Sequence, residues 1–205
     1  MKKKKIYFIT ATNTDVGKTF AAEKILKKYH KKGKKVGYFK PIETGVLSTP
    51  LDGSKLLKLT KKLNSDFDFS LSEVVPYQFR LAASPFVAKK KSCIDIQNIF
   101  EQTKKLLKKC DILIVEGAGG LMVPINKNYF MIDLIKDFQD IFNSKTILIS
   151  SSALGSINDT LLSQKALHRH SINYQWYINL YKDKKNFKTI TLPFYKEYFD
   201  KISFL

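Results

Sequence analysis

A short apolar run followed by a glycine-bearing turn most constrains how this chain can fold. Residues 6–11, IYFITA, are apolar and rich in β-branched and aromatic side chains, which is typical of a buried strand. The turn that follows ends in Gly17-Lys18-Thr19, and apolar residues then recur at helical spacing up to about Lys32. A second apolar run covers residues 35–42, so this stretch predicts one strand–helix–strand unit.

The rest of the chain is predicted to continue the alternation of strands and helices. Helices are expected at 49–63, which Asp52 would open, and at 94–109, 131–142 and 154–167. Strands are expected at 111–120, 145–151, 173–180 and 188–194, with strand and loop across 74–88. This order predicts an α/β fold in which residues 1–205 form a single-domain parallel sheet flanked by helices. Ligands of such sheets bind at the carboxyl ends of the strands.

The chain is strongly basic, with 36 Lys+Arg against 18 Asp+Glu and a formal net charge of +18. A nucleic-acid surface would favour arginine, whose planar fork bonds bases and phosphates bidentately. The only arginines are Arg80 and Arg169, so the charge indicates a general bias towards lysine, and we predict no nucleic-acid partner. No segment approaches the ~20 apolar residues that span a membrane, so we expect no membrane partner and a cytoplasmic protein.

The turn before the first helix has the sequence context of a phosphate-binding loop. Backbone N–H groups of such a loop cradle phosphate, helped by the field of the helix N-terminus. Lys18 would reach the β- and γ-phosphates, and Thr19 would hold Mg²⁺. The usual spacing is absent, because Thr12 stands where the common pattern has its first glycine. The alternative is an ordinary turn between a strand and a helix.

Two further charged residues leave the ends of predicted strands. Glu116 directly follows four apolar strand residues, where burying a carboxylate without a partner is costly. Mg²⁺ would remove that cost, because hard cations take carboxylate oxygens; a carboxylate that caps the following loop is the alternative. Lys40 ends the second strand and would point into the same crevice, although a solvated lysine is the ordinary expectation in so basic a chain.

Five motifs in this chain resemble those of the dethiobiotin synthetase family. They are TATNTDVGKT, GYFKPIETG, VVPYQFRLAASPFVA, VEGAGGLMVPI and LGSINDTLL, in the family's order and over most of the chain to about residue 160. The family's loop is one residue longer than the usual phosphate loop, so the unusual spacing is a family trait. Ala11 replaces the first glycine of that loop, and its methyl group is tolerated if the φ of this residue is negative.

The resemblance implies a P-loop NTPase-like fold and a role in biotin biosynthesis. Enzymes of the family close the ureido ring of dethiobiotin from 7,8-diaminopelargonate, CO₂ or bicarbonate, and ATP, with Mg²⁺. A carbamate formed on one amine attacks the γ-phosphate and gives a carbamic–phosphoric anhydride, from which the second amine displaces phosphate. The protein's part in such chemistry is to position the reactants and to neutralise charge.

The resemblance also carries roles onto individual residues. Lys18 resembles the lysine on the γ-phosphate, and Lys40 resembles the lysine that bridges carbamate and transferring phosphoryl group; both are expected to be catalytic. Thr19 and Glu116 resemble Mg²⁺ ligands. The family's third ligand is an aspartate that aligns with Lys55, so we expect the nearby Asp52 to serve in its place.

Binding positions follow from the same resemblance. The expected nucleotide contacts are Asn13, Thr14, Asp15, Val16, Gly17, Lys18, Thr19, Phe20, Glu116, Asn179 and Pro193. The expected contacts to the diamine are Thr14, Lys40, Thr44 and Gly119, joined across a homodimer by Gly155, Ser156, Ile157 and Asn158 at a helix N-terminus. Asn179 resembles an asparagine that reads adenine, but Leu180 stands where many relatives carry aspartate, which predicts weak discrimination among nucleotide bases.

Two other classes of function stay open from the residues alone. One is another P-loop enzyme, a nucleotide kinase or a partitioning-type ATPase. Kinases of that kind need arginines on the transferring phosphates, and partitioning ATPases commonly carry an additional lysine early in the loop, which TNTDV lacks. The other is a basic nucleic-acid-binding protein with a nucleotide switch, which steeply salt-dependent DNA binding would reveal.

Overall fold

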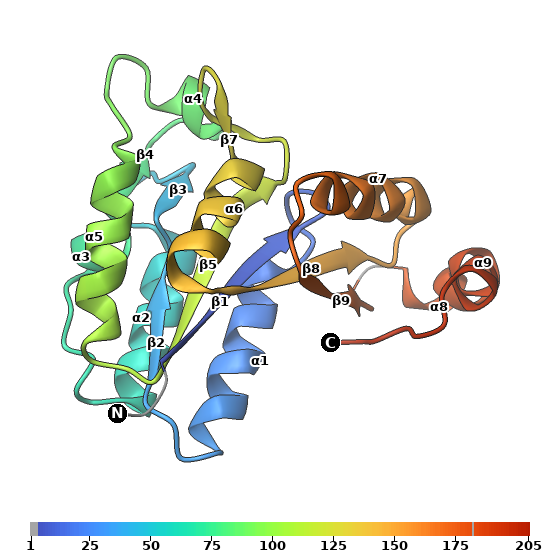
Figure 1. The fold of residues 1–205 in the computed structure, drawn as a ribbon, viewed down its shortest axis with the longest axis horizontal. Helices are drawn as coiled ribbons and strands as arrows, with labels where there is room; N and C mark the ends of the chain where they lie inside the picture. Colours follow the sequence, from blue (N-terminus) through green and yellow to red (C-terminus); the bar gives the residue numbers. More distant parts are fainter. Residues whose placement is uncertain (1–3, 182) are drawn as a thin grey trace.

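A five-stranded parallel sheet forms the centre of the computed structural model, which describes residues 4–181 and 183–205 (Figure 1). The strand order is β2-β5-β1-β8-β9, and every neighbouring pair is parallel. The strands are β1 (Lys5–Ala11), β2 (Val36–Phe39), β5 (Ile112–Gly120), β8 (Lys145–Ser151) and β9 (Tyr174–Asn179). Nearly all side chains of the inner strands are buried, as a parallel sheet with both faces covered requires.

Helices cover both faces of this sheet. They are α1 (Lys18–His30), α2 (Leu51–Leu63), α5 (Ile96–Leu107), α6 (Met131–Phe142) and α7 (Ser156–Arg169). The connections from β1 to β2 and from β5 to β8 cross the sheet in opposite directions, so right-handed crossovers place α1 and α6 on opposite faces (Figure 1). The α/β fold with a parallel sheet and flanking helices is therefore confirmed.

The predicted second strand is split at the Lys40-Pro41 step. β2 stays in the main sheet, while β3 (Ile42–Thr44) leaves it and pairs with β4 (Tyr77–Phe79) in a separate parallel ribbon. Proline has no N–H to give to a ladder, and the N–H of Lys40 is taken by the carbonyl of Val74 at 2.9 Å. The split turns the chain outward at the carboxyl end of the sheet.

The region between α2 and α5 is more helical than predicted. α3 (Leu71–Val74) precedes β4, and α4 (Pro85–Ala88) forms where only strand and loop were expected. Pro85 begins α4, a position where its missing N–H costs nothing. A small antiparallel ribbon of β6 (Pro124–Asn126) and β7 (Tyr129–Phe130) follows β5.

The strand predicted at 188–194 is wrong. The chain there forms α8 (Lys184–Asn186), the π-helix η1 (Phe187–Thr191) and α9 (Leu192–Tyr198), beside the β9 end of the sheet (Figure 1). The β-branched residues of KTIT favoured a strand, but the side chains that are buried follow a helical spacing of four. They are Phe187, Thr191 and Tyr195.

Residues beyond α9 return to the edge of β9. The carbonyl of Ser203 accepts from the N–H of Ile178 at 2.8 Å, and the N–H of Leu205 donates to the carbonyl of Ile178 at 3.0 Å. This contact brings Leu205 towards the carboxyl ends of the strands. Among residues 4–181 and 183–205, no helix combines the length and the apolar character of a membrane span.

Candidate active site

The segment between β1 and α1 has the geometry of a modified phosphate loop. Ala11 is the last residue of β1, fully buried and paired with Gly120 of β5, with the extended backbone of the strand. Its methyl group therefore fits, as the sequence predicted for a negative φ. Gly17 caps α1 with φ of 101°, and a Cβ at this position would lie 2.2 Å from Nδ2 of Asn179, so only glycine fits.

Lys18 lies in the first turn of α1 and is 8% exposed. Its Nζ donates to the backbone carbonyl of Asn13 at 3.2 Å. Burial and the neighbouring Lys40 ammonium lower the pKa of Lys18 to about 8, although the carboxylates of Glu116, Asp15 and Asp52 oppose this. An anionic ligand in front of Lys18 would therefore satisfy a charge that the protein alone leaves only partly compensated.

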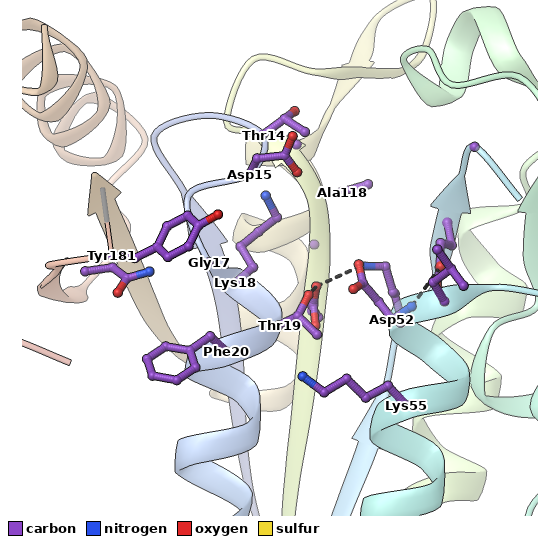
Figure 2. Close-up of a pocket in the computed structure, with 18 of the residues that line it drawn as sticks. Thr14, Asp15, Gly17, Lys18, Thr19, Phe20, Asp52, Lys55, Ala118 and Tyr181 are labelled. Atoms are coloured by element: carbon purple, nitrogen blue, oxygen red, sulfur yellow. Dashed lines mark hydrogen bonds and ion pairs between the residues drawn. The ribbon is translucent and has the colours of Figure 1, made fainter. Parts of the chain in front are cut away.

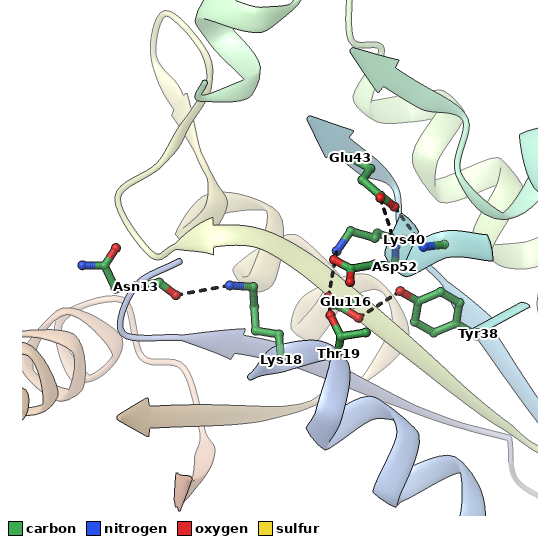
Figure 3. A network of polar contacts seen from close by, with 9 residues as sticks. Asn13, Lys18, Thr19, Tyr38, Lys40, Glu43, Asp52 and Glu116 are labelled. Carbon is green, nitrogen blue, oxygen red and sulfur yellow. Dashed lines mark hydrogen bonds and ion pairs between the residues drawn. The ribbon is translucent and has the colours of Figure 1, made fainter. Parts of the chain in front are cut away.

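Lys40 leaves the end of β2 and lies between two carboxylates (Figure 3). Its Nζ donates to Oε1 of Glu116 at 2.7 Å and to Oδ2 of Asp52 at 2.9 Å. Burial opposes the charged form of Lys40, but Glu116 and Asp52 outweigh it and raise the pKa of this lysine above its usual value. Lys40 is thus a fully charged, nearly buried ammonium and not a solvated surface lysine.

Glu116 is held by three side chains, which come from α1 and from β2 and its carboxyl end. Besides Lys40, the hydroxyl of Thr19 donates to its Oε1 at 2.8 Å, and the hydroxyl of Tyr38 donates to its Oε2 at 2.9 Å. The carboxylate is 1% exposed, so these hydrogen bonds satisfy a charge that would otherwise be costly to bury. Among the described residues, Glu116 is hydrogen-bonded to these side chains and not to the backbone of the following loop, which disfavours the loop-cap interpretation of Glu116.

Asp52 joins this cluster through Lys40 (Figure 3), whereas Lys55 lines the same pocket without a contact to Lys40 or Glu116 among the described hydrogen bonds and ion pairs. α2 begins at Leu51, so Asp52 lies in its first turn and faces Lys40. Burial alone would raise the pKa of Asp52, but the charge of Lys40 and hydrogen bonds from Lys40 and Thr19 lower it. The Lys55 ammonium instead pairs with Glu23 of α1 at 3.0 Å.

Two carboxylates and a hydroxyl, from Asp52, Glu116 and Thr19, are the hard oxygen donors that Mg²⁺ takes. Within the described part of the chain, no group of three or more His, Cys, Asp or Glu residues could hold a metal ion. The three donors from Asp52, Glu116 and Thr19 are fewer than the octahedron of Mg²⁺ needs. Phosphate oxygens and water complete the shell in proteins that bind Mg²⁺ in this way, so the donor set fits a metal that arrives with a nucleotide.

These side chains line one pocket of about 940 Å³ at the carboxyl ends of β1, β2 and β5 (Figure 2). The sequence-predicted residues that line it are Thr14, Asp15, Gly17, Lys18, Thr19, Phe20, Lys40, Thr44, Asp52, Glu116, Gly119 and Asn179. A volume of this size holds a ligand with several polar groups. The topology has thus gathered residues that are up to about 165 positions apart in sequence, from Thr14 to Asn179.

Comparisons with known proteins show the family of this chain. A family model described as an AAA domain matches residues 5–184. An ATP-dependent dethiobiotin synthetase from Sulfurovum sp. is 47% identical over 193 residues, which cover 94% of this chain and 90% of the relative. A second, from Wolinella succinogenes, is 40% identical over 193 residues, covering 93% and 88%. The chain belongs to the dethiobiotin synthetase family.

Solved structures similar to this dethiobiotin synthetase family member share its fold. A plasmid partition protein from Borrelia burgdorferi matches with a TM-score of 0.57 at 14% identity, covering 100% of this chain and 90% of that one. The MinD cell division protein from Aquifex aeolicus matches with a TM-score of 0.53 at 18% identity, covering 90% and 72%. At these identities the likeness concerns the fold alone, a P-loop NTPase-like sheet with flanking helices.

Some predicted contact residues of this family member lie apart from the pocket or meet it only through the backbone. Asn13 and Val16 offer backbone carbonyls, which accept from Lys18 and, at 2.9 Å, from Nδ2 of Asn179. Pro193 is exposed in α9 and is not among the lining residues. The four residues at the N-terminus of α7 also lie outside the pocket of this single chain; they are Gly155, Ser156, Ile157 and Asn158.

Tyr38, Glu43 and Tyr181 are among the residues of the site that the sequence did not reveal. Tyr38 precedes Lys40 by two positions on a strand, so both point to the same face, and that alternation could have revealed its contact with Glu116. Glu43 lies in the KPIETG motif and binds the start of α2. Tyr181 lines the pocket next to Leu180, where no local pattern marks it.

Proposed function

We propose that this protein catalyses the ATP- and Mg²⁺-dependent closure of the ureido ring of dethiobiotin, from 7,8-diaminopelargonate and CO₂. Its family makes it an ATP-dependent ligase of biotin biosynthesis; the substrates and the roles of individual residues are our proposal. The observation that carries the proposal is the cluster of two buried lysines and two carboxylates at the mouth of the phosphate loop. Such a cluster suits a reaction in which negative charge moves from a carbamate oxygen to the phosphate oxygen of the leaving ADP.

Lys18 and the loop backbone would bind the triphosphate. The N-terminus of α1 directs unpaired N–H groups at the pocket, and Lys18 adds a charge that lacks a full counter-charge in the free protein. Thr19, Asp52 and Glu116 would hold Mg²⁺, which neutralises phosphate charge when it is bound. Lys40 lines the same pocket as Lys18, so it would lie near the γ-phosphate of a nucleotide bound there.

Lys40 would stabilise the charge that develops during the transfer. One amine of the diamine takes up CO₂ as a carbamate, whose oxygen attacks the γ-phosphorus and releases ADP. The second amine then attacks the carbamate carbon, a C–N bond forms, and phosphate leaves with the C–O electron pair. Glu116 and Asp52 keep the Lys40 ammonium charged. Lys40 can therefore stabilise the carbamate, the transferring phosphoryl group and the released phosphate in turn, without itself losing a proton.

We also propose a homodimer that shares the diamine site. The N-terminus of α7 does not line the pocket of its own chain, yet Leu154 beside it is 79% exposed. The hydroxyl of Ser156 is buried and has no hydrogen-bond partner among the described residues. In a dimer this helix N-terminus could bind the distant carboxylate of a diamine held by the other chain. Leu47 and Leu51, 81% and 78% exposed, offer apolar surface for the contact.

The test is a coupled assay of phosphate release from ATP. Release should begin when diaminopelargonate and bicarbonate are added, and Lys18→Ala and Lys40→Ala should each abolish it. Dethiobiotin measured by mass spectrometry should appear at one equivalent per phosphate. Phosphate release that does not respond to the diamine would contradict the proposal and favour another P-loop activity.

A further inference from the structure

Glu43 makes two hydrogen bonds to the beginning of α2 (Figure 3). Its Oε1 accepts from the N–H of Asp52 at 3.1 Å, and its Oε2 accepts from the N–H of Gly53 at 3.0 Å. The first N–H groups of a helix have no partner inside the helix, and a carboxylate near them is favoured by the helix dipole. Pro50, at the N-cap position of α2, offers no side-chain hydrogen bond, so Glu43 supplies the cap from β3.

The packing around this contact leaves the start of α2 little freedom. Glu43 is 7% exposed, so its carboxylate has little access to water that could replace the two N–H donors. A Cβ on Gly53 would lie 2.3 Å from Cγ2 of Val75 and 3.2 Å from Oε2 of Glu43. The backbone of Gly53 is thus pressed between Glu43 and the segment that follows α3, which fixes where the first turn of α2 begins.

That first turn carries Asp52. The same residue whose N–H is held by Glu43 directs its carboxylate to Nζ of Lys40 at 2.9 Å. Three residues further on, the Lys55 side chain leads away to Glu23. A helix rotates by about 100° per residue, so a small change in where α2 begins would turn Asp52 away from Lys40.

We propose that Glu43 is a positioning residue that caps α2 and thereby holds the Asp52 carboxylate in the site. Glu43 also lines the pocket, but both of its carboxylate oxygens are bonded to the start of α2, so we assign it a role through Asp52. The inference rests on the proposed role of Asp52 as a Mg²⁺ ligand only for its kinetic consequence; the capping geometry is independent of that role. Residues that hold a metal ligand in place typically change metal affinity by about 10–100-fold when they are removed.

The first test is structural and needs no bound metal. In a crystal structure of the ligand-free Glu43→Ala protein, the Asp52 carboxylate should leave hydrogen-bond distance of Lys40. Glu43→Gln, which keeps one acceptor oxygen, should retain the contact. An Asp52 carboxylate that still meets Lys40 in Glu43→Ala would overturn the proposal whatever the enzyme's activity.

The second test is a double-mutant cycle on the free Mg²⁺ concentration that gives half the maximal rate. Glu43→Ala should raise this concentration about tenfold in the wild-type background and less than about twofold in Asp52→Ala, because Glu43 acts through Asp52. If Glu43→Ala raises this Mg²⁺ concentration by the same factor in both backgrounds, Glu43 does not act through Asp52, and the proposal is overturned. If Asp52→Ala itself leaves the Mg²⁺ requirement unchanged, the proposed ligand role of Asp52 fails, and the crystal structure alone decides the role of Glu43.

A matched control distinguishes the general effect of losing a helix cap from the specific effect of losing the cap of α2. Asp95 caps α5, with its Oδ1 accepting from the N–H of Gln97 at 2.9 Å, and it does not line the pocket. Asp95→Ala should lower the melting temperature to a similar extent as Glu43→Ala, while its Mg²⁺ requirement stays at the wild-type value. A shift in Mg²⁺ requirement in Asp95→Ala as large as in Glu43→Ala would overturn the assignment.

Discussion

The phosphate end of the pocket is lined by buried charged side chains, whereas its outer end, near β9, is lined by exposed aromatic side chains. At the phosphate end, the buried side chains of Lys18, Lys40 and Glu116 lie in the first turn of α1, at the end of β2 and on β5, and Lys40 and Glu116 are joined directly. At the outer end, Phe20 is 44% exposed and Tyr181 is 70% exposed. The first set is buried, whereas Phe20 lies on the exposed face of α1 and Tyr181 on the segment after β9.

This contrast predicts which part of a bound nucleotide the protein can select for. Charged groups that are buried and already paired need no rearrangement when charge develops beside them, so the phosphate end is pre-organised for chemistry. Exposed aromatic rings offer stacking area but few fixed donors or acceptors, and every base has a stacking face. We therefore expect strict requirements at the phosphate end and loose selection of the base at the other.

Replacing Lys40 by alanine should give the largest effect. The change removes the ammonium that faces the transferring group, and we expect kcat/KM to fall by about 10³-fold, the scale of one lost transition-state contact. It also leaves Glu116 and Asp52 without their shared cation, so the free energy of unfolding in urea should fall by about 3 kcal/mol. The exposed Lys58 is a control whose alanine variant should resemble the wild type in both measurements.

Replacing Asp52 by alanine should change the Mg²⁺ requirement of the enzyme more than its selection of the nucleotide base. The free Mg²⁺ concentration needed for half the maximal rate should rise about tenfold, because a hard oxygen donor is lost from the phosphate end. Lys55→Ala is the matched control, since Lys55 lies one turn further along α2 but pairs with Glu23. An unchanged Mg²⁺ requirement in Asp52→Ala would remove this residue from the metal site.

Selection of the nucleotide base should be weak. The values of kcat/KM for ATP, GTP, CTP and UTP should lie within about tenfold of one another, because Leu180 offers no polar group and the amide of Asn179 is engaged with Val16. Leu180→Asp should widen the range in favour of bases with an exocyclic amine. A preference for ATP above about 100-fold in the unmodified protein would contradict this picture of the outer end.

The smallest expected effect is a proton taken up when a nucleotide binds. Burial lowers the folded-state pKa of Lys18 from 10.5 to about 8, so the free protein holds this lysine increasingly neutral as the pH rises above 8. A triphosphate beside Lys18 raises its pKa again, and between pH 8 and 10.5 binding should therefore take up a proton. Near pH 9 the uptake should approach one proton and should vanish in Lys18→Met.

The measurement is isothermal titration calorimetry in buffers of different ionisation enthalpy. The slope of the observed heat against that enthalpy gives the number of protons taken up. At pH 7 the slope due to Lys18 should be close to zero, because the lysine is already charged on both sides of the reaction. A slope that is the same at pH 7 and at pH 9 would contradict the lowered pKa.

Local patterns were enough to determine the order of most elements and the phosphate-loop segment. The apolar run of β1, the glycine turn and the amphipathic α1 are each encoded within a few neighbouring residues, as are α6 and β8. The same local logic failed at residues 188–194. There the β-branched side chains favoured a strand, but packing of Tyr195 against Trp176 and Phe187 made the segment helical.

Only the tertiary structure decided which charged side chains of the site pair with one another. Lys40 and Glu116 are 76 residues apart in sequence, and no local spacing says that one ammonium will lie between two carboxylates. The same holds for Glu43, whose contact with α2 depends on the strand break at Pro41 and on the packing of Val75 against Gly53. Secondary structure follows mainly from neighbouring residues, whereas the pairing of buried charges follows from which elements the folded sheet brings together.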